Sequence, residues 1–109
     1  MTARLFLLQR VSAAFLAFAV AVHLATILYA IRGGLTAGEI LARTHGNALY
    51  LAFYSLFVIA AAVHAPIGLR NVLREWFGWK GVTADGGLLL FALLLLVSGL
   101  RAAAAVFLA

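Results

Sequence analysis

Two histidines in this chain lie inside long apolar runs, and they are the side chains best suited to chemistry there. His64 opens the stretch His64-Ala-Pro-Ile-Gly-Leu-Arg70, and His23 lies in an earlier run. An imidazole can bind a metal ion, carry a proton or form a hydrogen bond. Which of these applies depends on what the apolar runs are and on which residues share a face with each histidine.

The apolar runs have the length and composition of membrane spans. Hydrophobic residues make up 67% of the 109 residues, which is more than a soluble domain of this size can bury. Residues 11–31 and 48–69 each contain one ionisable side chain, the histidine, and residues 86–109 are interrupted only by Arg101. Each run is close to the roughly 20 residues that a helix needs to cross a bilayer. The sequence predicts an all-α membrane protein in which residues 1–109 form a single domain with three transmembrane helices.

The basic residues lie near the ends of these runs, where they anchor a chain in a membrane, so the net charge of +5 does not indicate binding to nucleic acid. The absence of cysteine excludes disulfides and thiolate metal sites. Because Gln9 and Arg10 split the first apolar stretch, we expect a retained helix rather than a cleaved signal. The positive-inside rule predicts a multi-pass protein of the inner or cytoplasmic membrane with its N-terminus in the cytoplasm. Five basic residues fall on that side (Arg4, Arg10, Arg70, Arg74 and Lys80) and three on the other (Arg32, Arg43 and Arg101).

The segments between the runs carry helix stop and start signals. Gly33-Gly34 predicts the end of the first span, and Thr36 followed by Glu39 forms a capping-box pattern that predicts a short interfacial helix in the first loop. The second span is expected to continue to about Trp76, with Gly78 and Gly81 breaking the helix. Thr83 and Asp85 are the predicted N-cap candidates of the third span.

Small residues share the helix face of His64. Ala60 and Ala61 precede it, and Gly68 follows one turn later. One interpretation is close helix packing with a hydrogen-bonded histidine. The other is space for a flat macrocycle whose haem iron is bound by the imidazole. Pro66 is expected either to kink the helix beside the histidine or to be tolerated within the membrane.

The two histidines are expected at different depths. His23 lies roughly 20 Å along its helix from Arg10, whereas His64 lies only roughly 9 Å from Arg70. If both arginines mark the cytoplasmic surface, the histidines cannot bind one iron, and each needs a partner histidine from another chain. The sequence therefore predicts one part of a multi-subunit helical bundle with haem sites shared between chains. His45, in the polar first loop, is expected to be solvated.

Arginines near the spans could bind haem propionates or quinone oxygens. Arg10 and Arg70 are placed for this role near His64. Arg101 either extends to the outer surface or pairs with the propionate of a haem near His23.

Together these residues resemble a known family. The motif Gln9-Arg10-Val11-Ser12-Ala13, the later His64-x-x-x-Gly68-x-Arg70 and the pair Glu75-Trp76 resemble the cytochrome b membrane-anchor subunits of succinate dehydrogenase and fumarate reductase. The resemblance covers the whole chain in length, three-span layout and motif order. It implies a subunit of a succinate:quinone oxidoreductase, in either direction of the reaction, that works with an iron–sulfur subunit, a flavoprotein subunit and a second membrane-anchor chain.

The resemblance also implies roles for individual residues. The family's motif histidine is an axial ligand of haem b, which carries over to His64, and the arginine near the quinone and the propionates carries over to Arg10. A two-haem member would use His23 as the second ligand. The expected haem contacts are His64, His23, Arg10, Arg70, Gly68 and Arg101, and the expected contacts of the quinone substrate are Arg10, Ser12, Glu75 and Trp76.

The chain departs from the family pattern at two quinone positions. Phe6 stands where the family often has a serine, and Trp76 stands where it often has a tyrosine. These polar roles could therefore belong to the partner chain. Two other functions compete with the redox subunit. One is a haem-free structural anchor for a soluble redox partner. The other is a small transporter that uses the histidines as a proton relay, which is disfavoured because no acidic residue lies within a span.

Overall fold

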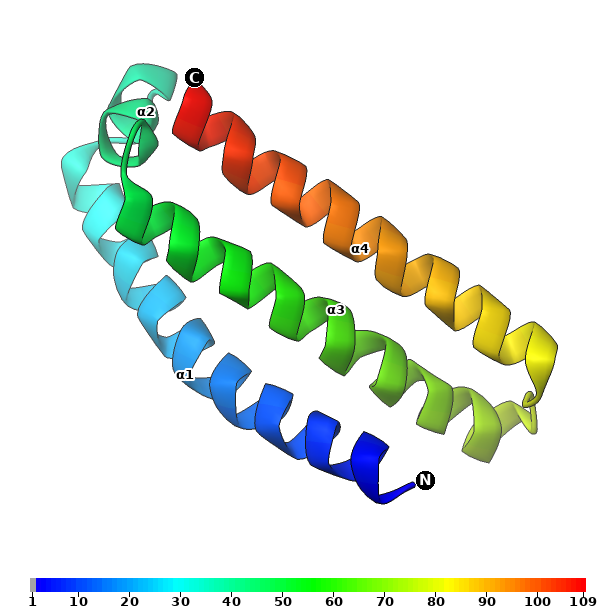
Figure 1. Cartoon of the computed structure of the whole chain (residues 1–109). Coiled ribbons are helices and arrows are strands. Elements are labelled where there is room, and N and C mark those ends of the chain that lie inside the picture. Colours follow the sequence, from blue (N-terminus) through cyan, green and yellow to red (C-terminus); the bar gives the residue numbers. More distant parts are fainter. Residues whose placement is uncertain (1) are drawn as a thin grey trace.

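The computed structural model describes residues 2–109, and this part of the chain folds into four helices and no strands (Figure 1). They are α1 (Ala3–Gly33), α2 (Ala37–Thr44), α3 (Ala48–Phe77) and α4 (Val82–Leu108). The three long helices are each long and apolar enough to cross a membrane. The predicted all-α membrane protein with three spans and a short helix in the first loop is therefore confirmed.

The three long helices lie side by side, with α3 between α1 and α4 (Figure 1). The residues buried in the contacts are mostly small, among them Ala19, Ala62, Ala84 and Ala103. At Gly99 of α4, an added Cβ atom would lie 2.5 Å from a methyl group of Val58 in α3. Small residues of this kind let membrane helices approach closely, while the large apolar side chains face outward. Consistent with that, many leucine, valine and phenylalanine side chains are exposed, as suits contact with lipid.

The first loop folds as the capping-box pattern predicts. Oγ1 of Thr36 accepts a hydrogen bond from the backbone N–H of Glu39 at 3.2 Å and lies 2.6 Å from the Glu39 carboxylate. Before it, Gly34 ends α1 with a φ of 104°, in the region that favours glycine. Asn47 caps α3 by accepting from the N–H of Tyr50 at 3.0 Å. These local bonds fix the start of α2 and of α3.

The second loop differs from the prediction in one respect. As expected, α3 runs to Phe77, one residue past Trp76, and Gly78 closes it in the left-handed conformation. The prediction that Thr83 or Asp85 caps the third span is wrong, because α4 begins at Val82 with Gly81 as its N-cap and no side-chain capping bond. Asp85 lies instead in the first turn of α4, where its carboxylate accepts a hydrogen bond from Nε of Arg70 at 3.2 Å. A carboxylate in that turn is also favoured by the helix dipole.

The end of α2 is hydrogen-bonded to the last turn of α4. Oγ1 of Thr44 donates to the carbonyl of Val106 at 3.0 Å, and the N–H of Gly46 donates to the carbonyl of Phe107 at 3.0 Å. Thr44 is almost completely buried there. The bonds satisfy carbonyl groups that a helix end otherwise leaves without a partner, and they bring the first loop against the far end of the chain.

Candidate functional site

His64 lies on the face of α3 that packs against α1. On this face, Tyr54 and Phe57 contact His23 of α1, and Gly68 is approached by Gln9 of α1. His64 falls between these two contacts at helical spacing, which places it on the same face of α3. The ring is partly buried, and its Nδ1 atom is fully buried without a hydrogen-bond partner among residues 2–109.

Gln9 shares this property and fills the space at Gly68. Its Oε1 atom is also buried without a partner in the described chain. A Cβ atom on Gly68 would lie 3.4 Å from Nε2 of Gln9. Gly68 therefore lies against the Gln9 side chain of the neighbouring helix and does not present an open face. The seam near His64 holds two buried polar atoms whose hydrogen-bonding capacity this chain does not satisfy.

His23 is bonded to α3. Its Nδ1 atom lies 2.9 Å from the hydroxyl oxygen of Tyr54, and its ring makes edge-to-face contacts with Tyr54 and Phe57, each at 5.7 Å between centroids. In the part of the chain described, the other ring nitrogen, Nε2, makes no hydrogen bond. Tyr54 and Phe57 precede His64 by about 10–15 Å along α3. The structure thus places the two histidines at different levels, as their sequence positions indicate.

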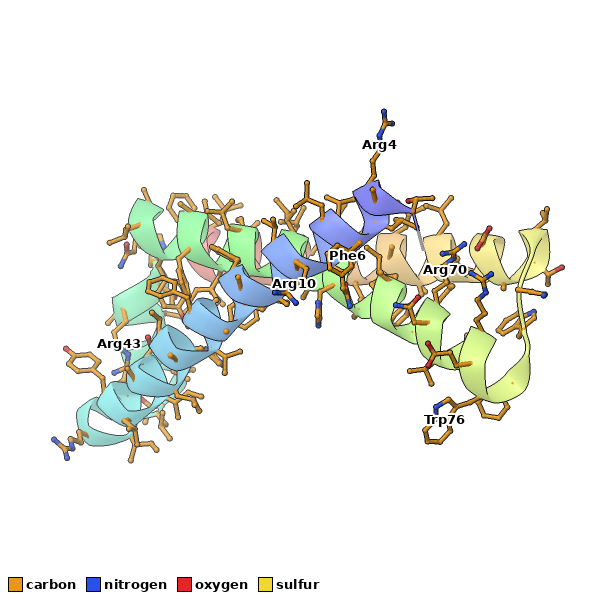
Figure 2. The ribbon with its side chains drawn as sticks, turned by 90° about the horizontal axis from the view of Figure 1, so that it is seen from below. Arg4, Phe6, Arg10, Arg43, Arg70 and Trp76 are labelled. Atoms are coloured by element: carbon orange, nitrogen blue, oxygen red, sulfur yellow. The ribbon has the colours of Figure 1, made fainter. Side chains whose placement is uncertain are left out.

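The three predicted arginines lie in different surroundings. Arg10 is exposed, and its guanidinium carbon lies 5.8 Å from the centre of the Phe6 ring on the same helix. Arg70 is turned toward α4, where it binds Asp85. Figure 2 shows Arg10 and Arg70 well apart, on different helices. Arg101 is exposed on α4.

The predicted quinone contacts are not gathered in one place within this chain. Ser12 is buried, and its hydroxyl donates to the carbonyl of Gln9 at 3.1 Å, within its own helix. Glu75 is exposed, and Trp76, which is 77% exposed, projects from the end of α3 (Figure 2). A quinone site that uses both groups would need surfaces from another chain. His45, which is expected to be solvated, is exposed.

The donor set fits haem iron only if a partner contributes. Among residues 2–109, no three histidine, cysteine, aspartate or glutamate side chains are grouped to hold a metal ion. A haem between two histidines requires one imidazole from each side, and this chain offers two at separate levels. The buried Nδ1 of His64 and the bonded Nδ1 of His23 are both compatible with ligation through Nε2, the nitrogen at the outer end of the ring.

Sequence reasoning missed the two residues that contact the histidine seam most closely. Aromatic residues recur through the first half of α3 and pack on one another, but their spacing does not connect Tyr54 with His23. The sequence also gives no sign that Gln9 faces Gly68. Both pairings depend on the register between α1 and α3, which the spacing within one helix does not reveal.

Comparisons with protein-family models, with curated proteins and with solved structures found no match to this chain.

Proposed function

We propose that the chain is a membrane-anchor cytochrome b subunit of a succinate:quinone oxidoreductase. In this role it binds haem b together with a partner chain and passes electrons between an iron–sulfur subunit and membrane quinone. The flavoprotein that handles succinate or fumarate would be a separate subunit, docked through the iron–sulfur protein on the cytoplasmic face.

The observation that carries the proposal is the buried Nδ1 of His64 without a hydrogen-bond partner in the described chain. An ionisable side chain within a membrane span is costly unless it is paired, and such residues usually have a function. Burying an unsatisfied polar atom costs about 1–3 kcal/mol. Iron bound at Nε2 would leave Nδ1–H as a donor, and a second chain that supplies its acceptor would give a physical reason for that cost.

Each histidine would have a defined part. His64 would donate the Nε2 lone pair to the iron of the haem nearer the basic end of the molecule, and His23 to the iron of a second haem. When bound, haem supplies one-electron transfer, and its potential depends on the axial ligands and their hydrogen bonds. Donation from Nδ1–H of His23 to Tyr54 would place the lone pair on Nε2 and fix the ring plane.

A haem-free structural anchor is the second candidate, and the packing around Gly68 favours it. Gln9 occupies the space beside this glycine, and Arg70 is already paired with Asp85. In this alternative the histidines stabilise the contact between α1 and α3, and the cytoplasmic basic residues hold a soluble redox protein.

Haem content separates the two candidates. The purified complex should be compared as wild type, His64→Ala, His23→Ala and His45→Ala by haem-to-protein ratio and reduced-minus-oxidised spectrum. We expect the first two substitutions each to remove one b-type haem. His45→Ala is the matched control, because it removes an exposed histidine and is expected to leave haem content unchanged. Full haem content in all variants, or none in the wild type, would leave the structural anchor as the function.

A further inference from the structure

A polar cavity lies where α3 turns into α4. It has a volume of about 370 Å³, and its charged lining consists of Arg70, Arg74, Lys80 and Asp85. Trp79 also lines it and packs toward the first turns of α4, because a Cβ atom on Gly87 would lie 3.8 Å from the Trp79 ring. The cavity is therefore built by the ends of two membrane spans and the short connection between them.

The cavity is positively charged. Of its three cations, Arg70 gives one N–H to Asp85, while Arg74 and Lys80 have no ion pair among residues 2–109. The first turn of α4 adds to this field, since Gly81 provides no side chain to cap its N–H groups. The groups that remain are N–H donors with positive charge, which together suit the oxygens of a phosphate.

An apolar groove continues from this cavity along the membrane spans. It has a volume of about 390 Å³ and shares Arg70 and Asp85 with the polar cavity. Leu5 of α1, Ala62 and Pro66 of α3, and Leu88 and Ala92 of α4 are among the residues that line it. A basic pocket at the end of the spans thus adjoins an apolar groove, with Arg70 and Asp85 in the wall of both.

We propose that this composite site binds an anionic phospholipid. The phosphodiester lies among Arg70, Arg74 and Lys80, and an acyl chain lies in the groove between α3 and α4. The apolar groove directly beside the basic pocket favours a lipid over free phosphate, because free phosphate would use only the polar part. Basic pockets between spans are suited to anionic headgroups. The proposal does not depend on haem or quinone binding.

The chain contains two tryptophans, so Trp76→Phe leaves Trp79 as the only indole and as a reporter within the site. This variant is reconstituted in phosphatidylcholine vesicles with a small fraction of phosphatidylglycerol brominated in its acyl chains. Bromine quenches nearby indole fluorescence. We expect stronger quenching than with the same fraction of brominated phosphatidylcholine, which contacts the protein only as bulk lipid.

Charge variants test the headgroup pocket. Adding Arg74→Gln and Lys80→Gln should reduce the preference for phosphatidylglycerol by about fivefold per cation. The matched control is Arg4→Gln with Arg32→Gln, which removes the same charge from two exposed positions outside the cavity. The control should keep the preference. Asp85→Asn removes the only anion of the cavity lining, so it should increase the preference for phosphatidylglycerol.

A groove variant tests the acyl chain. Ala92→Phe fills the apolar groove without changing charge, and we expect it to weaken quenching by phosphatidylglycerol. Circular dichroism confirms that each variant is folded. Equal loss in the Arg4/Arg32 control would show only general attraction to a charged surface and would overturn the proposal. A second pair of results would also overturn it: millimolar inorganic phosphate abolishes the preference for phosphatidylglycerol, and Ala92→Phe has no effect. The pocket would then bind phosphate alone.

Discussion

His23 of α1 and Tyr54 of α3 are joined by a hydrogen bond of 2.9 Å between the imidazole Nδ1 and the phenol oxygen. It is the one side-chain hydrogen bond that links α1 directly to another long helix within residues 2–109. Phe57 stacks with Tyr54 and meets the His23 ring edge-to-face, so aromatic rings lie beside the polar contact. The contact therefore joins the first two spans at one level and orients one candidate ligand.

Tyr54→Phe removes this bond and keeps the ring. We expect the purified chain in detergent to lose about 0.6 kcal/mol of stability, the average value for hydrogen bonds between membrane helices. Unfolding by dodecyl sulfate, followed by circular dichroism, measures the change. Tyr29→Phe is the control, because Tyr29 is 68% exposed and makes no contact of this kind. Equal stability of wild type and Tyr54→Phe would mean that the bond is not formed in solution.

Gly99→Ala tests the close approach of α3 and α4. The new methyl group would meet the Val58 side chain, and overpacking of this kind costs about 1–3 kcal/mol. Combining it with Val58→Ala should restore part of the loss, because the second change makes space. Gly86→Ala on the same helix is the control, since nothing lies within 4 Å of its added Cβ atom. Additive losses in the double variant would contradict the predicted contact.

Gln9→Met tests the unsatisfied polar atoms of the seam. In the isolated chain, replacing the amide by an apolar side chain of similar shape should be neutral or stabilising, by up to about 1 kcal/mol, because a buried oxygen without a partner is removed. The same unfolding assay measures the change. A loss of more than about 1 kcal/mol would show that the amide has a partner in the folded chain. Gln9→Ala, which leaves a cavity, should be destabilising.

Thr36→Ala tests the capping box of α2. Loss of an N-cap side chain typically costs about 1 kcal/mol, so the short helix should fray. Amide hydrogen exchange over residues 37–44 should become faster, while exchange in α4 away from its last turn should not change. Thr83→Ala is a suitable control, because Thr83 is exposed and does not cap α4. Unchanged exchange at Glu39 would contradict the capping role.

The sequence was sufficient for the spans and for most helix ends. Long apolar runs indicate membrane helices irrespective of their packing, and Thr36, Gly34 and Gly78 act through bonds and dihedral angles within a few residues of themselves. The N-cap of α4 was wrongly predicted, because Gly81 takes that position without a side-chain bond and Asp85 pairs with another helix instead. An ion pair with Arg70 depends on how the two spans meet, and local spacing contains no information about that.

The sequence predicts the position of each candidate site residue along its own helix but not the contacts between helices. The depths of His23 and His64 follow from helical rise, so their separation could be calculated in advance. The contact of Gln9 with Gly68 and the bond from Tyr54 to His23 could not, because both depend on the register of α1 against α3. The polar cavity is not apparent from the sequence, because its cations come together only through the turn at residues 78–81.

Hydrogen bonds hold α1 at its C-terminal end, next to α2. Near that end, Nη2 of Arg43 donates to the carbonyl of Gly34 at 2.6 Å, and α2 itself is fastened to the last turn of α4. Among the described residues of α1 that precede His23, none forms a hydrogen bond to another helix. A small rotation of α1 about this end therefore displaces Gln9 farther than His23, because Gln9 lies about 21 Å farther from the bonded end. The contact of Gln9 with Gly68, beside His64, is therefore opened more by such a rotation than the contact of His23 with Tyr54.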